Sequence, residues 1–437
     1  MDNAIIVFSS LCTLLFVGKL LRINCPVFQR LYLPSSVIGG LIGLTILSTC
    51  GKWIPAAIPA AIGKIPGFLI NIIFATIFLG TVTPRLKDVV RLAFPQLVIG
   101  QLLAWGQYVV GLGLAGFALA KLFPVPPAFG NLLEIGFEGG HGTVGGMAKS
   151  FTELAWPDGL ALGFTVATLG MIIGVVLGMI LIQWAHKRGY VKEVRAFEER
   201  RLFERRGLHL RRNRPSAGHQ TVMSDSIDSL AWHLTVVGLA VLIGYGIFHF
   251  IPLKGLPLFP FCMIGGVIME FIARTSRKSF LVDRVQMERI AGSSLDFLVV
   301  AAISTIKLSV VAKNWIPLTL LVLAGTLYTV FIVLVIARRV FRKNWFECAI
   351  AEFGQATGVT ATGLMLLRTV DPDNKTSAAI SFGYKQLLHE PFMGGGLWTA
   401  LALPLVYRIG WLNVWLISLG MLLLWAIAAG WLIRKNR

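Results

Sequence analysis

The sequence predicts an all-α polytopic membrane protein built from two inverted-topology repeats. The chain of 437 residues is 56% hydrophobic and only 14% charged, which is far below the charged fraction of a soluble protein. Many apolar runs reach the roughly 20 residues that a helix needs to cross about 30 Å of hydrocarbon. Short glycine-rich motifs recur between the two halves of the chain. We therefore expect five transmembrane helices and one re-entrant hairpin in each repeat, with one extra C-terminal helix.

The recurrence is clearest in the stretch IGFEGGHGTVGGMAKS, residues 135–150. Its Glu138, Gly140 and Thr143 reappear at the same spacing 214 residues later. An earlier motif, LPSSVIGG at residues 33–40, returns as FPFCMIGG 226 residues later. Two homologous halves, each with one broken glycine-rich segment, account for both matches. The later counterparts of the three residues are Glu352, Gly354 and Thr357.

The apolar runs divide the chain into four parts. The first repeat, residues 1–184, has predicted helices at 4–21, 33–50, 66–83, 93–120 and 159–184, with a hairpin at 128–154. A basic linker follows at residues 185–228. The second repeat, residues 229–405, has predicted helices at 229–250, 256–273, 291–312, 315–337 and 376–405, with a hairpin at 346–369. An additional C-terminal transmembrane helix lies in residues 406–437.

The positive charges predict the orientation of the chain. The net charge of +19 does not point to nucleic acid, because most Lys and Arg residues lie in short connections between apolar runs. One set of connections, which includes the linker, holds 31 basic residues, whereas the opposite set holds six. The richer set is expected in the cytoplasm, so the N-terminus is outside and the C-terminus inside an inner (plasma) membrane. This count requires the hairpin at 128–154 to enter from outside and the hairpin at 346–369 to enter from inside.

Inverted repeats with a broken segment at corresponding positions are typical of secondary transporters. Non-helical backbone at membrane depth is tolerated where it is buried in protein or lines a wet cavity. Two hairpins that enter from opposite sides would bring their tips together near the midplane. Helix ends there offer N–H groups to an anion and C=O groups to a cation. The pattern therefore predicts a site for a small anionic solute and a metal cation.

Four stretches resemble the sodium/glutamate symporter family, and the resemblance covers most of residues 30–400. They are FATIFLG (74–80), GGHGTVGGMAKSF (139–151), SSLDFLVVAAISTIKLSVV (293–311) and GVTATG (358–363). The resemblance implies an elevator-type, homodimeric symporter with Na+ as the coupling ion, in which one domain carries the substrate and the other forms the dimer scaffold. The stretch YKQLLHEPFMGGG (384–396) is more charged than the family pattern. The basic linker and the final helix are additions to that pattern.

The candidate substrate-binding residues gather at the two hairpin tips and on the helix that follows the second tip. An ionisable group at membrane depth is costly and usually has a role. His141 therefore either belongs to the site or has its polar atoms satisfied by nearby backbone. The glycines form either a turn that the ligand approaches or small contacts between helices. The threonines offer hydroxyl groups to the solute or bond back to their own helix carbonyls. The full set is Gly139, Gly140, His141, Gly142, Thr143, Gly358, Thr360, Thr362 and Lys385.

The candidate ion-coupling residues are acidic side chains within the predicted spans. Glu138 and Glu352 occupy matched positions and are cation ligands, proton carriers or structural acids. Asp296 and Lys307 share one face of a predicted helix. This face is either a polar stripe inside a span, or it reflects Lys307 reaching the outer interface. Glu390 is expected beyond the bilayer centre, where it binds the coupling cation or pairs with Lys385. Lys385 is expected to attract the anionic solute or to neutralise Glu352, and Pro391 to end or kink the helix. The more peripheral Glu134, Glu153 and Glu347 are expected to be solvated.

The sequence favours one of three classes of function. A cation-coupled carrier of a small organic anion explains the two broken segments. A membrane enzyme lacks support because the sequence has no GxSxG, HExxH, Walker or paired-carboxylate motif. An ion channel would show a filter in symmetric copies, whereas the two broken segments differ in sequence. The cation is Na+ or a proton, the Na+ ligands stay open, and no other cofactor is expected.

Overall fold

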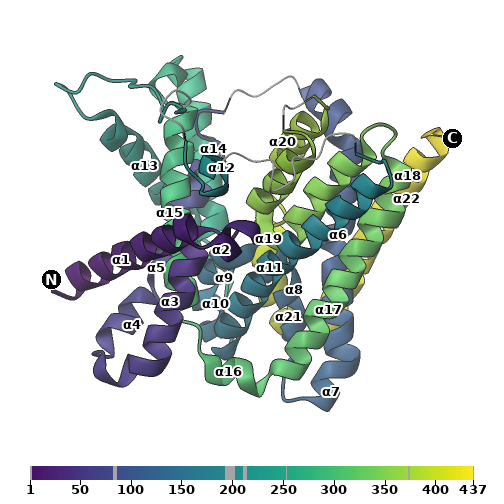
Figure 1. The fold of residues 1–437 in the computed structure, drawn as a ribbon, viewed down its shortest axis with the longest axis horizontal. Coiled ribbons are helices and arrows are strands. Elements are labelled where there is room, and N and C mark those ends of the chain that lie inside the picture. Colours follow the sequence, from purple (N-terminus) through teal and green to yellow (C-terminus); the bar gives the residue numbers. More distant parts are fainter. Residues whose placement is uncertain are drawn as a thin grey trace.

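The computed structural model describes residues 2–81, 86–191, 202–209, 214–251, 253–372 and 375–436. The regular elements in these ranges are helices, and none of them is a strand (Figure 1). Eight described helices are long and apolar enough to cross a membrane, which confirms the all-α membrane class. They are Asn3–Asn24, Ser35–Trp53, Ala57–Thr76, Leu92–Leu122, Asp158–Lys187, Ser229–His249, Trp315–Val340 and Trp411–Lys435.

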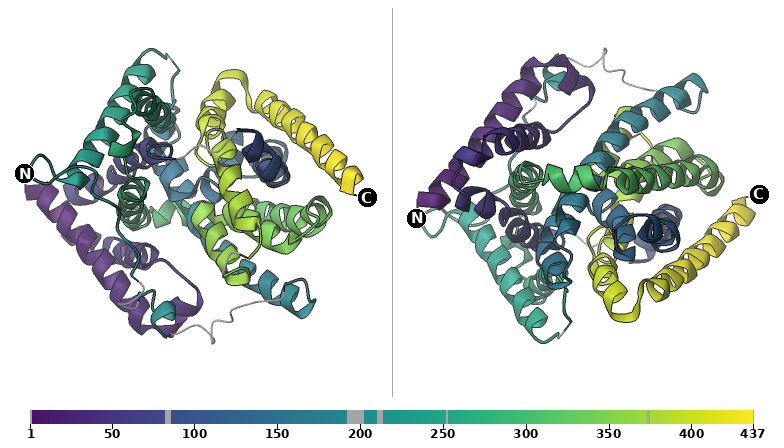
Figure 2. Two further views of the ribbon diagram at one scale, coloured as in Figure 1. Left: turned by 90° about the horizontal axis from the view of Figure 1, so that it is seen from above. Right: turned by 90° about the horizontal axis from the view of Figure 1, so that it is seen from below.

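Helices from two distant parts of the chain pack into one group, which we call the first bundle. Its N-terminal members are α1 (Asp2–Asn24), α3 (Ser35–Cys50), α4 (Ala57–Ile62) and α5 (Ile65–Thr76). Its later members are α13 (Ser229–His249), α14 (Phe259–Thr275) and α15 (Arg284–Ser304). Helices α5 and α15 pack against each other, α1 and α3 cover α15, and α13 and α14 cover α5. The two halves of the sequence therefore interlock inside this bundle (Figure 2).

Most of the remaining helices form a second bundle. Its members are α6 (Leu86–Leu114), α8 (Leu132–Phe137), α9 (Gly140–Gly146), α10 (Ala148–Glu153), α11 (Asp158–Lys187), α17 (Trp315–Phe331), α19 (Trp345–Val370), α20 (Ala378–His389), α21 (Leu397–Ile409) and α22 (Trp411–Asn436). Short helices connect them: α7 (Ala120–Leu122), α16 (Leu308–Lys313) and α18 (Arg338–Val340). Helix α22 packs along α6, where the Trp415 indole donates a hydrogen bond to the Val109 carbonyl at 3.0 Å. The bundles meet where α9 packs on α5 and α15.

The helix predicted at 291–312 is shifted toward the N-terminus in the structure. Helix α15 begins at Arg284 and ends at Ser304. The Thr305 hydroxyl donates to the Ala301 carbonyl at 2.9 Å and so caps the last turn. Lys307 then has an extended backbone, with φ −81° and ψ 97°. The prediction that Lys307 lies on one helix face with Asp296 is therefore wrong.

The helix predicted at 376–405 is two helices in the structure, α20 and α21. Helix α20 ends at His389, and α21 begins at Leu397. Pro391 cannot donate a backbone hydrogen bond. Gly394 and Gly395 have φ of +65° and +107°, which side chains rarely adopt. The second bundle thus contains a third interruption, next to the two that the glycine-rich segments predict.

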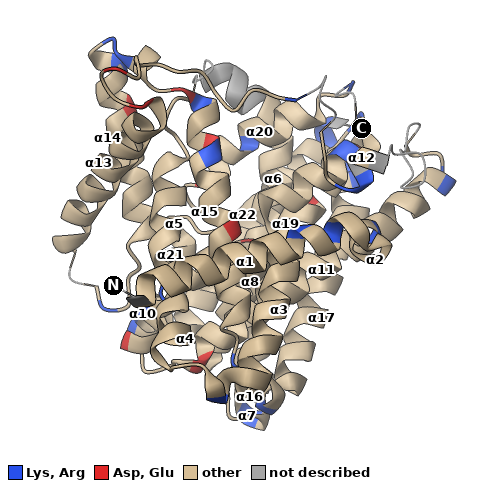
Figure 3. Cartoon of the chain, turned by 60° about the vertical axis from the view of Figure 1, so that its left-hand side comes forward, with Lys and Arg blue, Asp and Glu red and all other residues tan. Residues whose placement is uncertain are grey.

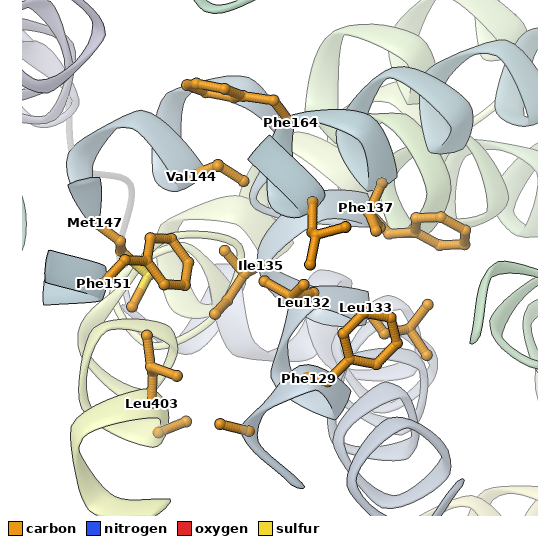
Figure 4. Close-up of a cluster of buried hydrophobic side chains, with 14 of the residues drawn as sticks. Phe129, Leu132, Leu133, Ile135, Phe137, Val144, Met147, Phe151, Phe164 and Leu403 are labelled. Atoms are coloured by element: carbon orange, nitrogen blue, oxygen red, sulfur yellow. The ribbon is translucent and has the colours of Figure 1, made fainter. Parts of the chain in front are cut away.

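The first glycine-rich segment folds back on itself beside α11. Helix α8 runs in the same direction as α11, and α9 and α10 return in the opposite direction. Along α8, the contacts with α11 are Leu132 with Gly163, Gly136 with Val166, and Phe137 with Gly170. Along α9 and α10, they are His141 with Thr168, Val144 with Gly163, and Phe151 with Gly159. The turn between the two arms therefore lies beside the middle of α11. Figure 4 shows the apolar side chains, among them Phe137, Val144 and Phe164, that hold these arms together.

The second glycine-rich segment, α19, folds back in the same manner from the other end of α11. Its helix is broken at Gly358, with φ −154°, and at Val359, with φ +63°. The two arms touch each other where Gly354 packs on Gly363. Along α11 the contacts are Gly358 with Met171, Thr362 with Gly174, and Leu366 with Gly178. The first segment thus occupies the half of α11 near Asp158, and the second occupies the half near Lys187.

The described part of the predicted linker holds one short helix, α12 (Leu202–Arg205). Residues 192–201 and 210–213 of the linker lie outside the described residues. The linker contacts the first bundle where Lys19 Nζ donates to the Gly207 carbonyl at 2.9 Å, and again at the start of α15, where His219 Nδ1 lies 3.2 Å from Asp283 Oδ2.

Candidate substrate and ion site

The two breaks meet in the middle of the second bundle. Gly140 has φ +67°, and Val359 has φ +63°. A Cβ placed on Gly140 would lie 2.4 Å from the Val359 Cγ1 atom, so this position accepts only glycine without a shift of the opposing break. The predicted close approach of the two tips is therefore present for Gly140. Gly354 instead packs on Gly363, between the two arms of α19.

A buried carboxylate and a histidine lie directly beside this contact. The Glu138 Oε1 and His389 Nε2 atoms are 2.5 Å apart, and both side chains are buried. The Gln101 amide of α6 faces the other ring nitrogen, Nδ1, at 3.1 Å. Trp105 donates to the Gln101 carbonyl oxygen, which fixes that amide with its N–H toward His389. A neutral imidazole with its proton on Nε2 satisfies every one of these contacts.

A lysine and a second glutamate form an ion pair one turn earlier on α20. Lys385 Nζ lies 3.2 Å from Glu352 Oε2, and neither side chain has more than 1% exposure. Gln96 of α6 donates to Glu352 Oε1 at 3.0 Å. A Cβ on Gly100 would lie 2.4 Å from Lys385 Cε, so the absence of a side chain at Gly100 makes room for the pair. The predicted alternative in which Lys385 pairs with Glu390 is wrong, because Lys385 pairs with Glu352.

Gln355 joins the two pairs into one network. Its carbonyl oxygen accepts from Lys385 Nζ at 2.9 Å and from Gln386 at 2.7 Å. Its amide donates to Glu138 Oε1 at 3.3 Å. The remaining oxygen, Glu138 Oε2, is buried and has no hydrogen-bond partner in the described part of the chain. A buried, unpaired carboxylate oxygen is costly, so it marks a place for a proton or a cation.

Glu390 extends the network to the first residues after the α19 break. Thr360 donates its hydroxyl proton to Glu390 Oε1 at 3.0 Å and accepts from Gln386 at 2.9 Å. Three acidic side chains, Glu138, Glu352 and Glu390, therefore share this network with one lysine. Even a charged His389 would leave the acids in excess. At membrane depth that excess requires a bound cation or a proton.

Glu134 and Glu347 are buried, which corrects the expectation that they are solvated, whereas Glu153 is partly exposed. The Tyr108 hydroxyl donates to Glu134 Oε2 at 2.5 Å. The Thr399 hydroxyl at 2.7 Å and the Gly394 amide at 2.9 Å both donate to Oε1. The carboxylate thus ties α8 to α6 and to the interruption before α21, and it is fully satisfied.

His141 and two of the threonines are held by the protein itself. His141 Nε2 lies 2.9 Å from the Thr168 hydroxyl of α11, and the imidazole is buried. Thr143 bonds to the Gly139 carbonyl, and Thr362 bonds to the Gly358 carbonyl, each within its own helix. Thr360 alone among the three threonines connects to an acidic side chain.

Two of the predicted site residues lie away from the network. Gly142 faces Ile70 of α5, so it belongs to the contact between the bundles. Asp296 is exposed on α15, where the Ser36 side chain hydrogen-bonds to it and the positive charge of Lys19 lies nearby. The structure brings Glu138, Glu352, Glu390 and Lys385 together and does not bring Asp296 to them.

Several network residues were not identified from the sequence, above all Gln96, Gln101, Gln355 and His389. The signal for the first two was present, because α6 carries three buried glutamines, at 96, 101 and 107, within an otherwise apolar run. Polar groups inside a span are costly and therefore mark functional or network positions.

Comparison with known proteins decides the family. A model of the sodium/glutamate symporter family matches residues 3–372. The chain belongs to this family. It is therefore an integral membrane transport protein, of a family whose members carry glutamate with sodium. A search of curated proteins finds no match. The matched range includes both breaks and Glu138 and Glu352, and it ends before Lys385, His389 and Glu390.

Proposed function

We propose that this family member is a secondary active transporter that couples the entry of Na+ to the uptake of glutamate or a related small organic anion. The observation that carries the proposal is the contact between the two breaks, at Gly140 and Val359, beside a network with more acidic than basic groups. Broken helices that meet at mid-depth are how such carriers bind ions and solutes. Because acidic groups outnumber basic groups in this network, it needs a coupling cation.

Equivalent contacts in the two halves support an inverted repeat. A Cβ on Gly39 would meet the Leu14 carbonyl oxygen, and a Cβ on Gly265 would meet the Ala240 carbonyl oxygen. Both members of the second pair lie 226 residues after their counterparts, which is the offset of the sequence motifs. The same small residue thus makes the same helix contact twice, once between α1 and α3 and once between α13 and α14.

The two broken segments are proposed to be re-entrant hairpins that enter from opposite membrane faces. They occupy opposite halves of α11, and their turns meet in its middle. Helices α7 and α16 lie at one end of the molecule, and α12 lies at the other with the C-terminus (Figure 3). We place the end with α12, which lies within the basic linker, in the cytoplasm, and the N-terminus outside.

Within this site we assign different roles to the charged groups. Glu138, through its unpartnered oxygen, and Glu390 provide oxygen ligands for the coupling cation, which as a hard ion prefers oxygen. Lys385 is the fixed counter-ion of Glu352 and becomes available to the solute carboxylate when that pair opens. The backbone at Gly358 and the Thr360 hydroxyl complete the solute site. Gly139 and Gly140, at the turn of the first hairpin, form its opposite wall.

An elevator movement fits the packing between the bundles. Helix α9 presents glycines to the first bundle, with Gly142 against Ile70 and Gly145 against Pro66. A surface of small residues allows two helices to approach closely and to slide without interlocking side chains. The second bundle, with the network inside it, would move along the first bundle, which would form the scaffold. The homodimer is proposed from the resemblance to the family alone.

Uptake of labelled L-glutamate into proteoliposomes tests the proposal. An inward Na+ gradient should accumulate glutamate above its external concentration, and a sodium ionophore should abolish accumulation. A proton gradient without Na+ serves as the comparison. Competition by unlabelled dicarboxylates shows which solutes the site accepts. Equal uptake with and without Na+ would reject Na+ coupling, and chemical alteration of glutamate would point to an enzyme.

A further inference from the structure

A cavity of about 740 Å³ lies between the two bundles, away from the network described above. Its walls come from the C-terminal part of α3, from α4 and the residues that follow it, from the segment between α15 and α16, and from Leu160 of α11. Its volume is within the roughly 300–1,000 Å³ of ligand pockets. The polar side chains in its lining are Ser48, Lys64, Ser304, Thr305, Lys307 and Ser309.

The lining is positively charged. Lys64 and Lys307 approach from different walls, and the described residues that line the cavity include no Asp or Glu. Both lysine side chains are exposed, and neither ammonium group has a hydrogen bond or ion pair with another described residue. The end of α15 contributes a partial negative charge of about one half, which is smaller than the two full charges of the lysines. The cavity is therefore suited to an anion.

The corresponding place at the other end of the first bundle is filled. There Arg284, at the start of α15, donates to the carbonyls of Thr76, Ile77 and Leu79 at 3.0, 2.8 and 3.2 Å. By the 226-residue offset, the position of Arg284 corresponds to Ile58 in α4. Ile58 cannot bond to the end of α15 as the guanidinium bonds to the end of α5. One end of the pseudo-symmetric pair is thus closed by an arginine, and the other end is a cavity.

We propose that this cavity is an external vestibule that binds the carboxylate groups of the solute on Lys64 and Lys307 before the solute reaches the network around Lys385. The inference rests on the proposed function, because it takes the solute to be a small carboxylate and this end of the molecule to be outside. Two ammonium groups on different walls match an anion with two carboxylates better than a monocarboxylate. The hydroxyl groups of Ser48 and Ser309 add donors for the same carboxylates.

The test measures the KM for external L-glutamate in proteoliposomes with an inward Na+ gradient. We expect the double variant Lys64→Gln, Lys307→Gln to raise the KM by about tenfold, with Vmax within twofold of the wild type, because the loss concerns capture rather than translocation. Lys64→Arg with Lys307→Arg should restore the KM, because the charge is kept. Lys313→Gln is the matched control, since Lys313 is an exposed lysine of α16 outside the lining.

The outcomes separate this inference from the proposed function and from lipid binding. A wild-type protein without Na+-driven glutamate uptake would reject the proposed function itself. Normal wild-type uptake with an unchanged KM in the double glutamine variant would overturn the vestibule alone. The measurement is repeated in phosphatidylcholine with and without phosphatidylglycerol. A wild-type KM that rises with phosphatidylglycerol, and a variant KM that does not, would assign the lysines to a lipid phosphate and would also overturn the vestibule.

Discussion

At the scale of single residues, the buried Lys385–Glu352 pair contributes to the stability of the second bundle. Both groups are buried, and removal of one partner leaves a charge without compensation. We predict that Lys385→Met lowers the free energy of unfolding by about 3–5 kcal/mol. The double variant Lys385→Met, Glu352→Gln should recover much of this loss, because it removes both charges. Thermal unfolding in detergent of Lys385→Met, Glu352→Gln and the double variant provides the measurement. A loss in the double variant equal to the sum of the two single losses would show that the pair is not coupled.

A second residue-scale prediction concerns the contact between the breaks. Gly140→Ala adds a Cβ at a positive φ and directly against Val359, so the two turns must separate. We predict that glutamate uptake falls at least tenfold, while the protein is still extracted as a folded species. Gly383→Ala is the control, because a Cβ at Gly383 would meet open space. Wild-type uptake by Gly140→Ala would remove the turn contact from the mechanism.

At the scale of elements, the end of α5 depends on a cation from α15. Arg284 bonds to three carbonyls at the C-terminal end of α5 and just beyond it, where the helix dipole also favours a positive charge. We predict that Arg284→Gln lowers the free energy of unfolding by about 2 kcal/mol, the typical size of a hydrogen bond to a charged group. Arg289→Gln, an exposed change on the same helix, should leave the unfolding temperature unchanged. Equal unfolding temperatures for both variants would contradict this role.

The sequence contained most of the information on elements and less on their partners. Span length and apolarity are local properties, and they predicted the long helices, including the C-terminal α22. The interruption before α21 was expected at Pro391, which ends or kinks a helix, although residues 376–405 were counted as one span. The pairing of His389 with Glu138 joins residues 251 positions apart, so local patterns could not reveal it. The same reason explains why Glu134 was expected to be solvated.

At the scale of the whole molecule, the central claim is that the two broken segments enter from opposite sides of the membrane. The structure supports it through the opposite halves of α11 that the segments occupy. The orientation of the chain then decides which segment faces which compartment. Lys121 precedes the first segment, Lys343 precedes the second, and both side chains are exposed.

Labelling of single cysteines at these two positions tests the claim most directly. Lys121→Cys and Lys343→Cys are made separately in a chain whose five native cysteines are replaced by serine or alanine, since Cys50 is exposed. Intact cells are then treated with a membrane-impermeant maleimide. We predict that Lys121→Cys is labelled in intact cells and that Lys343→Cys is labelled only after the membrane is opened. Labelling of both variants from the same side would contradict opposed hairpins, and with them the shared site at the middle of the bilayer.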